Sequence, residues 1–341
     1  MKRILILLLA VISVLSMTLV SCTSATTEAG TDASTGSQTA DESTQEAEKL
    51  DINIAVLKGP TGMGAAYLMS EAEASNTLHN YNFTIESAPD AVTAGIVKGS
   101  YDIAAVPTNL AAVLNSKDGV DVRVIAVNTL GTLYLLEKGE TVNSLADLAG
   151  KSIVASGEGT AADAVLSRLI ASLDDPSSVT VHYASEHSEA VALAASGEYD
   201  IAVLPEPHVT SLMKKDAGFR IALDLTQQWE GAGYGQLVMG ALICTKAFLR
   251  EHPEAVDQFI QDYAKSANYV NTNIPEASQL IEKYGIAAAA VAEAAIPNCN
   301  IVCLTGQEMK TALNSFYTQL NEFKPALIGG AIPADELYYV K

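Results

Sequence analysis

An internal repeat constrains the fold of this chain more than any other feature of its sequence. Residues 99–107 read GSYDIAAVP and residues 197–205 read GEYDIAVLP, so that six of nine positions are identical at an offset of 98 residues. The same offset places Gly59 on Gly157, near the start of each copy. Similarity at a fixed offset indicates one structural plan used twice. The sequence therefore predicts two similar folded units.

Strands alternate with helices in both copies. The first copy predicts strands at 52–57, 81–86 and 103–106, and the second predicts strands at 151–155, 179–183 and 201–204, with helices between them. Such alternation is typical of parallel sheets wound by right-handed crossovers. The expected fold class is α/β, with each lobe a mostly parallel sheet flanked by helices. In such sheets, ligands bind beyond the carboxyl ends of the strands.

Two apolar segments, residues 122–136 and 236–244, belong to neither copy. The first is placed to carry the chain out of one lobe and the second to bring it back. We therefore expect lobe one at residues 50–128 plus 237–341 and lobe two at residues 129–236, joined by two crossover segments with a cleft between them. A double hinge of this kind allows the lobes to close as a clamp.

The N-terminal segment predicts export. Lys2 and Arg3 precede the apolar run at 4–20, which suits a secretory signal peptide at residues 1–21. The run ends in Leu-Val-Ser-Cys22, which resembles the bacterial lipobox and makes Cys22 the expected lipidation site. An ordinary signal peptide with an incidental cysteine and a simple membrane anchor are the alternatives. Residues 22–49 lack large apolar side chains and are predicted to be a disordered tether, so the folded part would hang outside the cell membrane.

Composition excludes several classes of protein. The 49% of hydrophobic residues excludes a disordered chain, and a net charge of -20 argues against a nucleic-acid partner, which would require clustered Lys and Arg. Beyond Cys22 the chain has Cys244, Cys299 and Cys303, an odd number that implies no disulfide framework. Buried thiols are the favoured interpretation, with a local bridge between Cys299 and Cys303 as the alternative. No metal site and no cofactor are expected.

Glycine-rich loops at the start of each copy are the first candidates for a binding site, because glycines permit close approach of a ligand to backbone N–H groups. The alternative is a tight turn without a ligand. Polar and aromatic residues near the strand ends and the hinge are further candidates. For three of them a structural role is equally open: Glu206 could cap a helix, Asn128 could make a structural hydrogen bond, and Trp229 could be a buried aromatic plug. The candidate ligand-binding residues are Thr61, Gly62, Met63, Gly64, Thr108, Asn109, Asn128, Ser156, Gly157, Gly159, Thr160, Glu206, Trp229 and Tyr234.

The order of several short motifs carries a family resemblance. They are KGPTGMG at 58–64, YDIA at 101–104, LPEP at 204–207, FLREHPE at 248–254 and IGGAIP at 328–333. Together with the lipobox they resemble the solute-binding proteins of ABC importers, in the branch for nitrate, sulfonates, taurine and thiamine-pyrimidine precursors. The resemblance implies a periplasmic-binding-protein type II fold. It also implies a monomer that captures a small organic solute, either an aminopyrimidine-like heterocycle or a sulfonate, and delivers it to a permease and its ATPase.

Two features depart from the family pattern. Cys299 and Cys303 are unusual, and no Arg lies in a cleft loop, which argues against a salt bridge to an acidic solute. An enzyme on the same scaffold, similar to menaquinone-pathway enzymes or pyrimidine synthases, is the main alternative to a non-enzymatic receptor, and a surface sensor is another. No G-x-S-x-G or H-E-x-x-H motif is present. His182, His187 and His208 lie near one another in the sequence, but their spacing fits no metal-binding motif.

Overall fold

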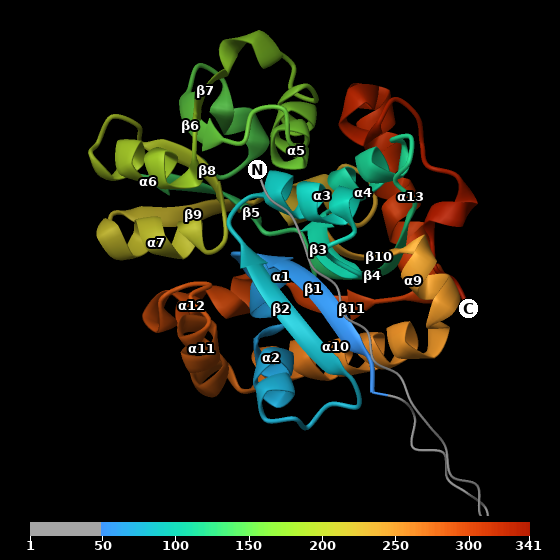
Figure 1. Ribbon diagram of the computed structural model, residues 1–341. Coiled ribbons are helices and arrows are strands. Elements are labelled where there is room, and N and C mark those ends of the chain that lie inside the picture. Colours follow the sequence, from blue (N-terminus) through green and yellow to red (C-terminus); the bar gives the residue numbers. More distant parts are fainter. Residues whose placement is uncertain (1–48) are drawn as a thin grey trace, which may run out of the picture. The chain divides into compact units, whose positions relative to one another are not determined.

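The computed structural model describes residues 49–341 (Figure 1). The expected signal peptide, Cys22 and the tether up to residue 48 lie outside the described residues. Among residues 49–341, no helix is both long enough and apolar enough to cross a lipid bilayer.

A six-stranded sheet forms the centre of lobe one. Its strands are β1 (Asp51–Leu57), β2 (Asn80–Glu86), β3 (Ile103–Pro107), β4 (Val122–Leu130), β10 (Val238–Thr245) and β11 (Ile301–Leu304), in the order β11-β4-β10-β3-β1-β2. β1 pairs in parallel with β2 and β3, whereas β10 is antiparallel to both β3 and β4. The outer strand β11 is antiparallel to β4.

A five-stranded sheet forms the centre of lobe two. Its strands are β5 (Leu133–Lys138), β6 (Ser152–Ser156), β7 (Thr180–Ala184), β8 (Ile201–Pro205) and β9 (Phe219–Asp224), in the order β7-β6-β8-β5-β9. β6 is parallel to β7 and β8, and β5 is antiparallel to β8 and β9. The α/β class and the two lobes are confirmed, but both sheets are mixed rather than mostly parallel. The strands that follow the crossings, β5 and β10, enter each sheet antiparallel to their neighbours.

The repeat is confirmed in three dimensions. β1, β2 and β3 alternate with α2 (Ala66–Glu73), α3 (Pro89–Lys98) and α4 (Thr108–Asn115). In lobe two, β6, β7 and β8 alternate with α5 (Ala161–Ile170), α6 (His187–Ala195) and α7 (His208–Lys215) in the same order. The remaining helices are α1 (Pro60–Met63), α8 (Leu225–Gly231), α9 (Lys246–Glu251), α10 (Pro253–Thr272), α11 (Ile274–Lys283), α12 (Ala289–Ala295) and α13 (Gly306–Phe323).

The chain crosses between the sheets twice. The apolar run at 122–136 divides into β4 and β5, one in each sheet, with Gly131 and Thr132 between them. The chain returns between α8 and β10. The three cysteines of residues 49–341 are free thiols: Cys244 and Cys299 are buried, as expected, and Cys303 is half-buried.

Alternating side chains of β1 face two separate apolar layers. Ile54 belongs to a cluster with Phe259 of α10, and Ala55 belongs to another with Val92 of α3. The second cluster continues into lobe two, where it includes Val165 of α5. In Figure 1, α13 lies beside the six-stranded sheet and α6 and α7 lie together on the far side of lobe two. The lobes therefore share a continuous apolar core in this structure.

Candidate functional site

Three polar side chains meet at the carboxyl edge of the lobe-two sheet. Ser156 ends β6, while His187 and His208 are the first residues of the helices that follow β7 and β8. The Ser156 hydroxyl forms a short hydrogen bond with Nδ1 of His187. The rings of His187 and His208 lie with their centroids 4.8 Å apart. Because β7, β6 and β8 are parallel neighbours, their ends bring these residues together. We call Ser156, His187 and His208 the Ser–His–His cluster.

Burial controls the charge of this cluster. Burial lowers the pKa of His187, although the carboxylate of Glu186 acts in the opposite direction. Burial, together with the nearby His187, lowers the pKa of His208 to about 4. Transfer of an imidazolium out of water is unfavourable, so both rings are neutral at pH 7. The cluster therefore offers uncharged hydrogen-bonding groups.

The loop after β6 adds backbone donors beside Ser156. Gly157 and Gly159 adopt the left-handed conformation, with φ of 79° and 76°. The Thr160 N–H donates to the carbonyl of Gly157, and the Gly159 N–H donates to Asp163. The N–H groups of Gly157 and Glu158 donate to no protein group within residues 49–341. Two backbone donors are thus available next to the cluster.

The matching loop of lobe one differs from the expectation. Instead of remaining an open loop, it winds into the short helix α1, in which Gly62 and Met63 donate to the Gly59 carbonyl and Gly64 donates to that of Pro60. Met63 is fully buried. The expectation of free N–H groups at Gly62 and Gly64 is therefore wrong, since the turn itself uses them.

Close packing explains the two glycines of this turn. A Cβ atom added to Gly62 would lie 2.3 Å from the Leu57 carbonyl oxygen, and one added to Gly64 would lie 2.4 Å from the Tyr263 hydroxyl. Real Cβ contacts are not this short, so glycine is required by the protein's own packing. Thr61 is half-buried, and its hydroxyl donates to the Leu57 carbonyl at 3.4 Å.

Glu206 caps a helix and connects the lobes. Its carboxylate accepts hydrogen bonds from the Thr210 N–H and hydroxyl, both at 3.1 Å. The amide of Asn298 in lobe one also donates to it at 3.4 Å, and the Tyr134 hydroxyl of lobe two donates to the Asn298 carbonyl at 2.9 Å. Burial raises the pKa of Glu206 despite these hydrogen bonds. Of the two roles considered from sequence, the structure contains the helix cap.

Thr108 and Asn109 are used within lobe one. The Thr108 hydroxyl is buried and donates to the Val238 carbonyl at 2.8 Å. The Asn109 amide donates to the Leu327 carbonyl at 3.3 Å, which ties α4 to the C-terminal segment. Both side chains therefore have structural partners.

Asn128 keeps an unused donor. It is fully buried on β4, two residues before the outgoing crossing, and its Nδ2 has no hydrogen-bond partner within residues 49–341. A Cβ built on Gly240 would lie within 3 Å of both Asn128 and Thr61, so these two side chains flank the same position. An unpaired buried amide is costly, which keeps Asn128 as a candidate ligand contact.

The aromatic pair near the hinge is internal. Trp229 is fully buried in the shared core and packs edge-on against Tyr234, with centroids 4.9 Å apart. The Arg168 guanidinium lies 4.7 Å from the centre of the Tyr234 ring. The structure thus places Trp229 as a buried plug, the alternative to ligand stacking, and Tyr234 half-exposed beside it.

The histidines do not form a metal centre. His182 is exposed and stacks on Tyr199 at 5.5 Å, apart from the Ser–His–His cluster. Within residues 49–341, no group of three or more His, Cys, Asp or Glu side chains is arranged to hold a metal ion.

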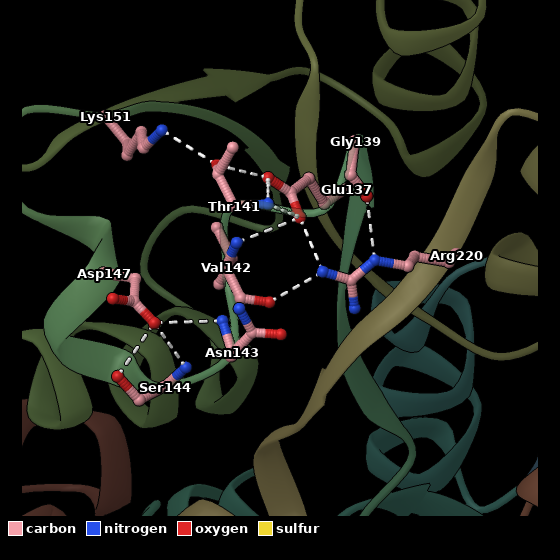
Figure 2. A network of polar contacts seen from close by, with 9 residues as sticks. All are labelled: Glu137, Gly139, Thr141, Val142, Asn143, Ser144, Asp147, Lys151 and Arg220. Carbon is pink, nitrogen blue, oxygen red and sulfur yellow. Dashed lines mark hydrogen bonds and ion pairs between the residues drawn. The ribbon is translucent and has the colours of Figure 1, made fainter.

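An ion pair between a buried carboxylate and a half-buried arginine in lobe two was not anticipated from the sequence. Glu137 of β5 is 2% exposed and accepts hydrogen bonds from the Thr141 N–H and hydroxyl, the Val142 N–H and Arg220, as Figure 2 shows. Burial alone would raise the pKa of Glu137, but the hydrogen bonds from Thr141 and Val142 and the Arg220 charge hold it below its usual value. Glu137 and Arg220 are 83 residues apart in sequence, so no local pattern reveals the pair.

The His187–His208 pair was likewise missed as a binding feature. Its only sequence signal is that each histidine lies just after a strand of the second copy, where parallel strands end. The sequence did not show that these two strand ends flank the end of β6.

A comparison with known protein families identifies one family whose model matches the chain. The model of the family described as menaquinone biosynthesis matches residues 64–322, which includes both copies of the repeat. The chain belongs to the menaquinone biosynthesis family. No curated protein sequence matches it.

Solved structures similar to this family member share its fold. An ABC transporter structure from Parabacteroides distasonis matches with a TM-score of 0.73 and 24% identity, over 85% of this chain and 99% of that chain. The periplasmic aliphatic sulphonate binding protein SsuA from Escherichia coli matches with a TM-score of 0.65 and 15% identity, over 80% and 87%. The desulfurization enzyme DSZB matches with a TM-score of 0.59 and 11% identity, over 86% and 97%. The expected type II fold is confirmed, and this fold is shared by binding proteins and an enzyme.

Proposed function

We propose that this protein is the lipid-anchored, extracytoplasmic solute-binding component of an ABC importer. In this role it captures a small organic solute, an aminopyrimidine-like heterocycle or a sulfonate, and delivers it to the permease and its ATPase. The similar folds of the Parabacteroides distasonis ABC transporter protein and of SsuA support the proposal. The signal-like run before Cys22 and the polar stretch after it support export and anchoring.

The observation that carries the proposal is the polar site at the carboxyl edge of the lobe-two sheet. The Ser–His–His cluster and the free N–H groups of its loop lie at the carboxyl ends of three neighbouring parallel strands. Glu206, which follows one of these strands, already bonds to Asn298 in the opposite lobe. A solute bound at this edge would touch both lobes and stabilise their closed arrangement.

An enzyme on the same scaffold is the second candidate. The hydrogen bond between Ser156 and His187 favours it, because a hydroxyl paired with an imidazole is a common arrangement for proton transfer. The family description and the similar fold of DSZB point in the same direction. The predicted export signal favours the binding protein, since the chain would then be separated from cytoplasmic substrates.

Thermal unfolding of the full chain in detergent against a solute panel separates the two candidates. The panel contains thiamine-pyrimidine precursors, sulfonates, taurine and nitrate. A ligand at about 100 times its dissociation constant adds roughly 2.7 kcal/mol of stability, which corresponds to a shift of several degrees. We expect a shift with one class of compound and recovery of that compound unchanged. Conversion of the bound compound would instead establish the enzyme.

The lipid anchor has its own test. We expect Cys22→Ala to abolish labelling by a radioactive fatty acid and to release the protein from the membrane fraction. Cys303→Ala, which removes a thiol far along the chain, serves as the control and should be labelled normally. Normal labelling of Cys22→Ala would refute the lipobox assignment.

A further inference from the structure

We propose that the Ser–His–His cluster binds an uncharged group with a C=O next to an N–H, as in a cyclic amide, imide or ureide, and that it discriminates against sulfonates and carboxylates. This inference rests on the proposed function and names the solute class that the lobe-two half of the site recognises. It is carried by the charges of three loops and by the hydrogen-bonding pattern of the cluster.

The loops around the cluster carry negative charge without a compensating cation. The segments that follow β6, β7 and β8 contain no lysine or arginine, and each contains one glutamate: Glu158, Glu186 and Glu206. Burial keeps His187 and His208 neutral at pH 7, so they supply no positive charge. An anionic ligand would be repelled by these carboxylates and would lose its hydration, whereas an uncharged ligand avoids both costs.

The cluster presents one donor and one acceptor to a ligand. When the Ser156 hydroxyl donates to Nδ1 of His187, Nε2 of that ring carries a proton and donates, while the serine oxygen can still accept. When Nδ1 carries the proton instead, Nε2 accepts and the serine hydroxyl donates outward. Either tautomer pairs with a ligand that has both an N–H and a C=O.

The neighbouring backbone favours the same ligand. The N–H groups of Gly157 and Glu158, which have no partner within the described chain, supply donors for the ligand carbonyl. A sulfonate or carboxylate contains acceptors alone, so the acceptor of the cluster would stay unpaired opposite it. An unpaired buried polar group is unfavourable, and this supplies the discrimination.

The test is isothermal titration calorimetry of the full chain at pH 7.5 with four solutes. Hydantoin and uracil represent the uncharged class, and methanesulfonate and acetate represent the anions. We expect measurable binding of at least one uncharged solute and binding of both anions that is weaker by at least about tenfold. His187→Ala and Ser156→Ala should each weaken binding of the uncharged solute by about tenfold, because each removes one hydrogen bond to the solute.

Matched variants distinguish a direct contact from a structural effect. His187→Gln keeps a donor and an acceptor and should retain more binding than His187→Ala. His182→Ala, which removes an exposed histidine outside the cluster, should bind as the unmodified protein does. Circular dichroism of each variant confirms that it is folded.

Three results would overturn the inference. They are tighter binding of methanesulfonate or acetate than of both uncharged solutes, no binding of either uncharged solute, and binding that is unchanged in folded His187→Ala and Ser156→Ala. In the first case the proposed function survives, because a solute is still captured without conversion. The proposed function itself fails only if the bound compound is converted or the wider panel gives no ligand.

Discussion

Replacing His208 with asparagine is expected to make the protein less sensitive to acid. His208 lies at the start of α7 beside His187, where burial lowers its pKa to about 4 from its usual value of 6.5. The unfolded chain therefore takes up a proton at His208 near pH 6.5, whereas the folded protein resists protonation until about pH 4. The contribution of His208 to the free energy of unfolding is therefore fully present above pH 6.5 and declines as the pH falls toward 4.

The size of the effect follows from this difference in pKa. A separation of about 2.5 units corresponds to a total of about 3 kcal/mol, at roughly 1.4 kcal/mol per unit. Most of it, about 2.5 kcal/mol, is lost between pH 7.5 and pH 4.5, because the unfolded state is then almost fully protonated at this site while most folded molecules are not. The asparagine of His208→Asn cannot be protonated in this pH range, so this variant does not lose this part of its free energy of unfolding.

Urea unfolding at pH 7.5 and pH 4.5, followed by the fluorescence of the single tryptophan Trp229, measures the difference. We expect the free energy of unfolding to fall by about 2.5 kcal/mol more in the unmodified protein than in His208→Asn. Comparing the two pH values removes any constant cost of the substitution. His182→Asn, at an exposed histidine, should behave as the unmodified protein does. Equal losses in the unmodified protein and His208→Asn would refute the assignment of His208 as a half-buried group that stays neutral in the folded protein.

Three further predictions concern stability and burial. Glu137→Ala should cost about 2 kcal/mol in urea unfolding, because it removes the acceptor of the Thr141 and Val142 N–H groups and the negative charge beside Arg220, and a cost below about 1 kcal/mol would contradict this. Gly62→Ala should cost about 1 to 3 kcal/mol through the contact with the Leu57 carbonyl, while Gly231→Ala, with nothing within 4 Å of its new methyl group, should cost nothing measurable. Trp229 should show blue-shifted emission and resist quenching by iodide, and strong quenching would show that its ring is accessible.

The repeat made most of the fold predictable. Strands of the second copy fall where the first copy places them, since the positions of β3 and β8 differ by the same 98 residues as the two motifs. The two crossings were also visible as apolar segments outside the repeat. The direction of the strands that follow the crossings could not be predicted from the sequence, because strand direction depends on the side from which the connecting segment enters the sheet. Both sheets are therefore mixed.

The repeat was less reliable for the binding site, because equivalent loops have different structures. The loop at 59–64 winds into α1 and uses its own N–H groups, whereas the loop at 157–160 keeps two donors free. Packing against Leu57 and Tyr263 requires the glycines of the first loop. A glycine in the sequence does not reveal whether it is needed for internal packing or for close approach of a ligand.

The sequence by itself determined two α/β lobes, two crossings, an expected export signal and a set of loops at the strand ends, because these depend on local periodicity and on spacing along the chain. Only the tertiary structure decided which polar groups meet. Ser156, His187 and His208 are separated by 31 and 21 residues, and they join because three parallel strands end side by side. Their neutral state likewise comes from burial among neighbours distant in sequence, a property that no local pattern carries.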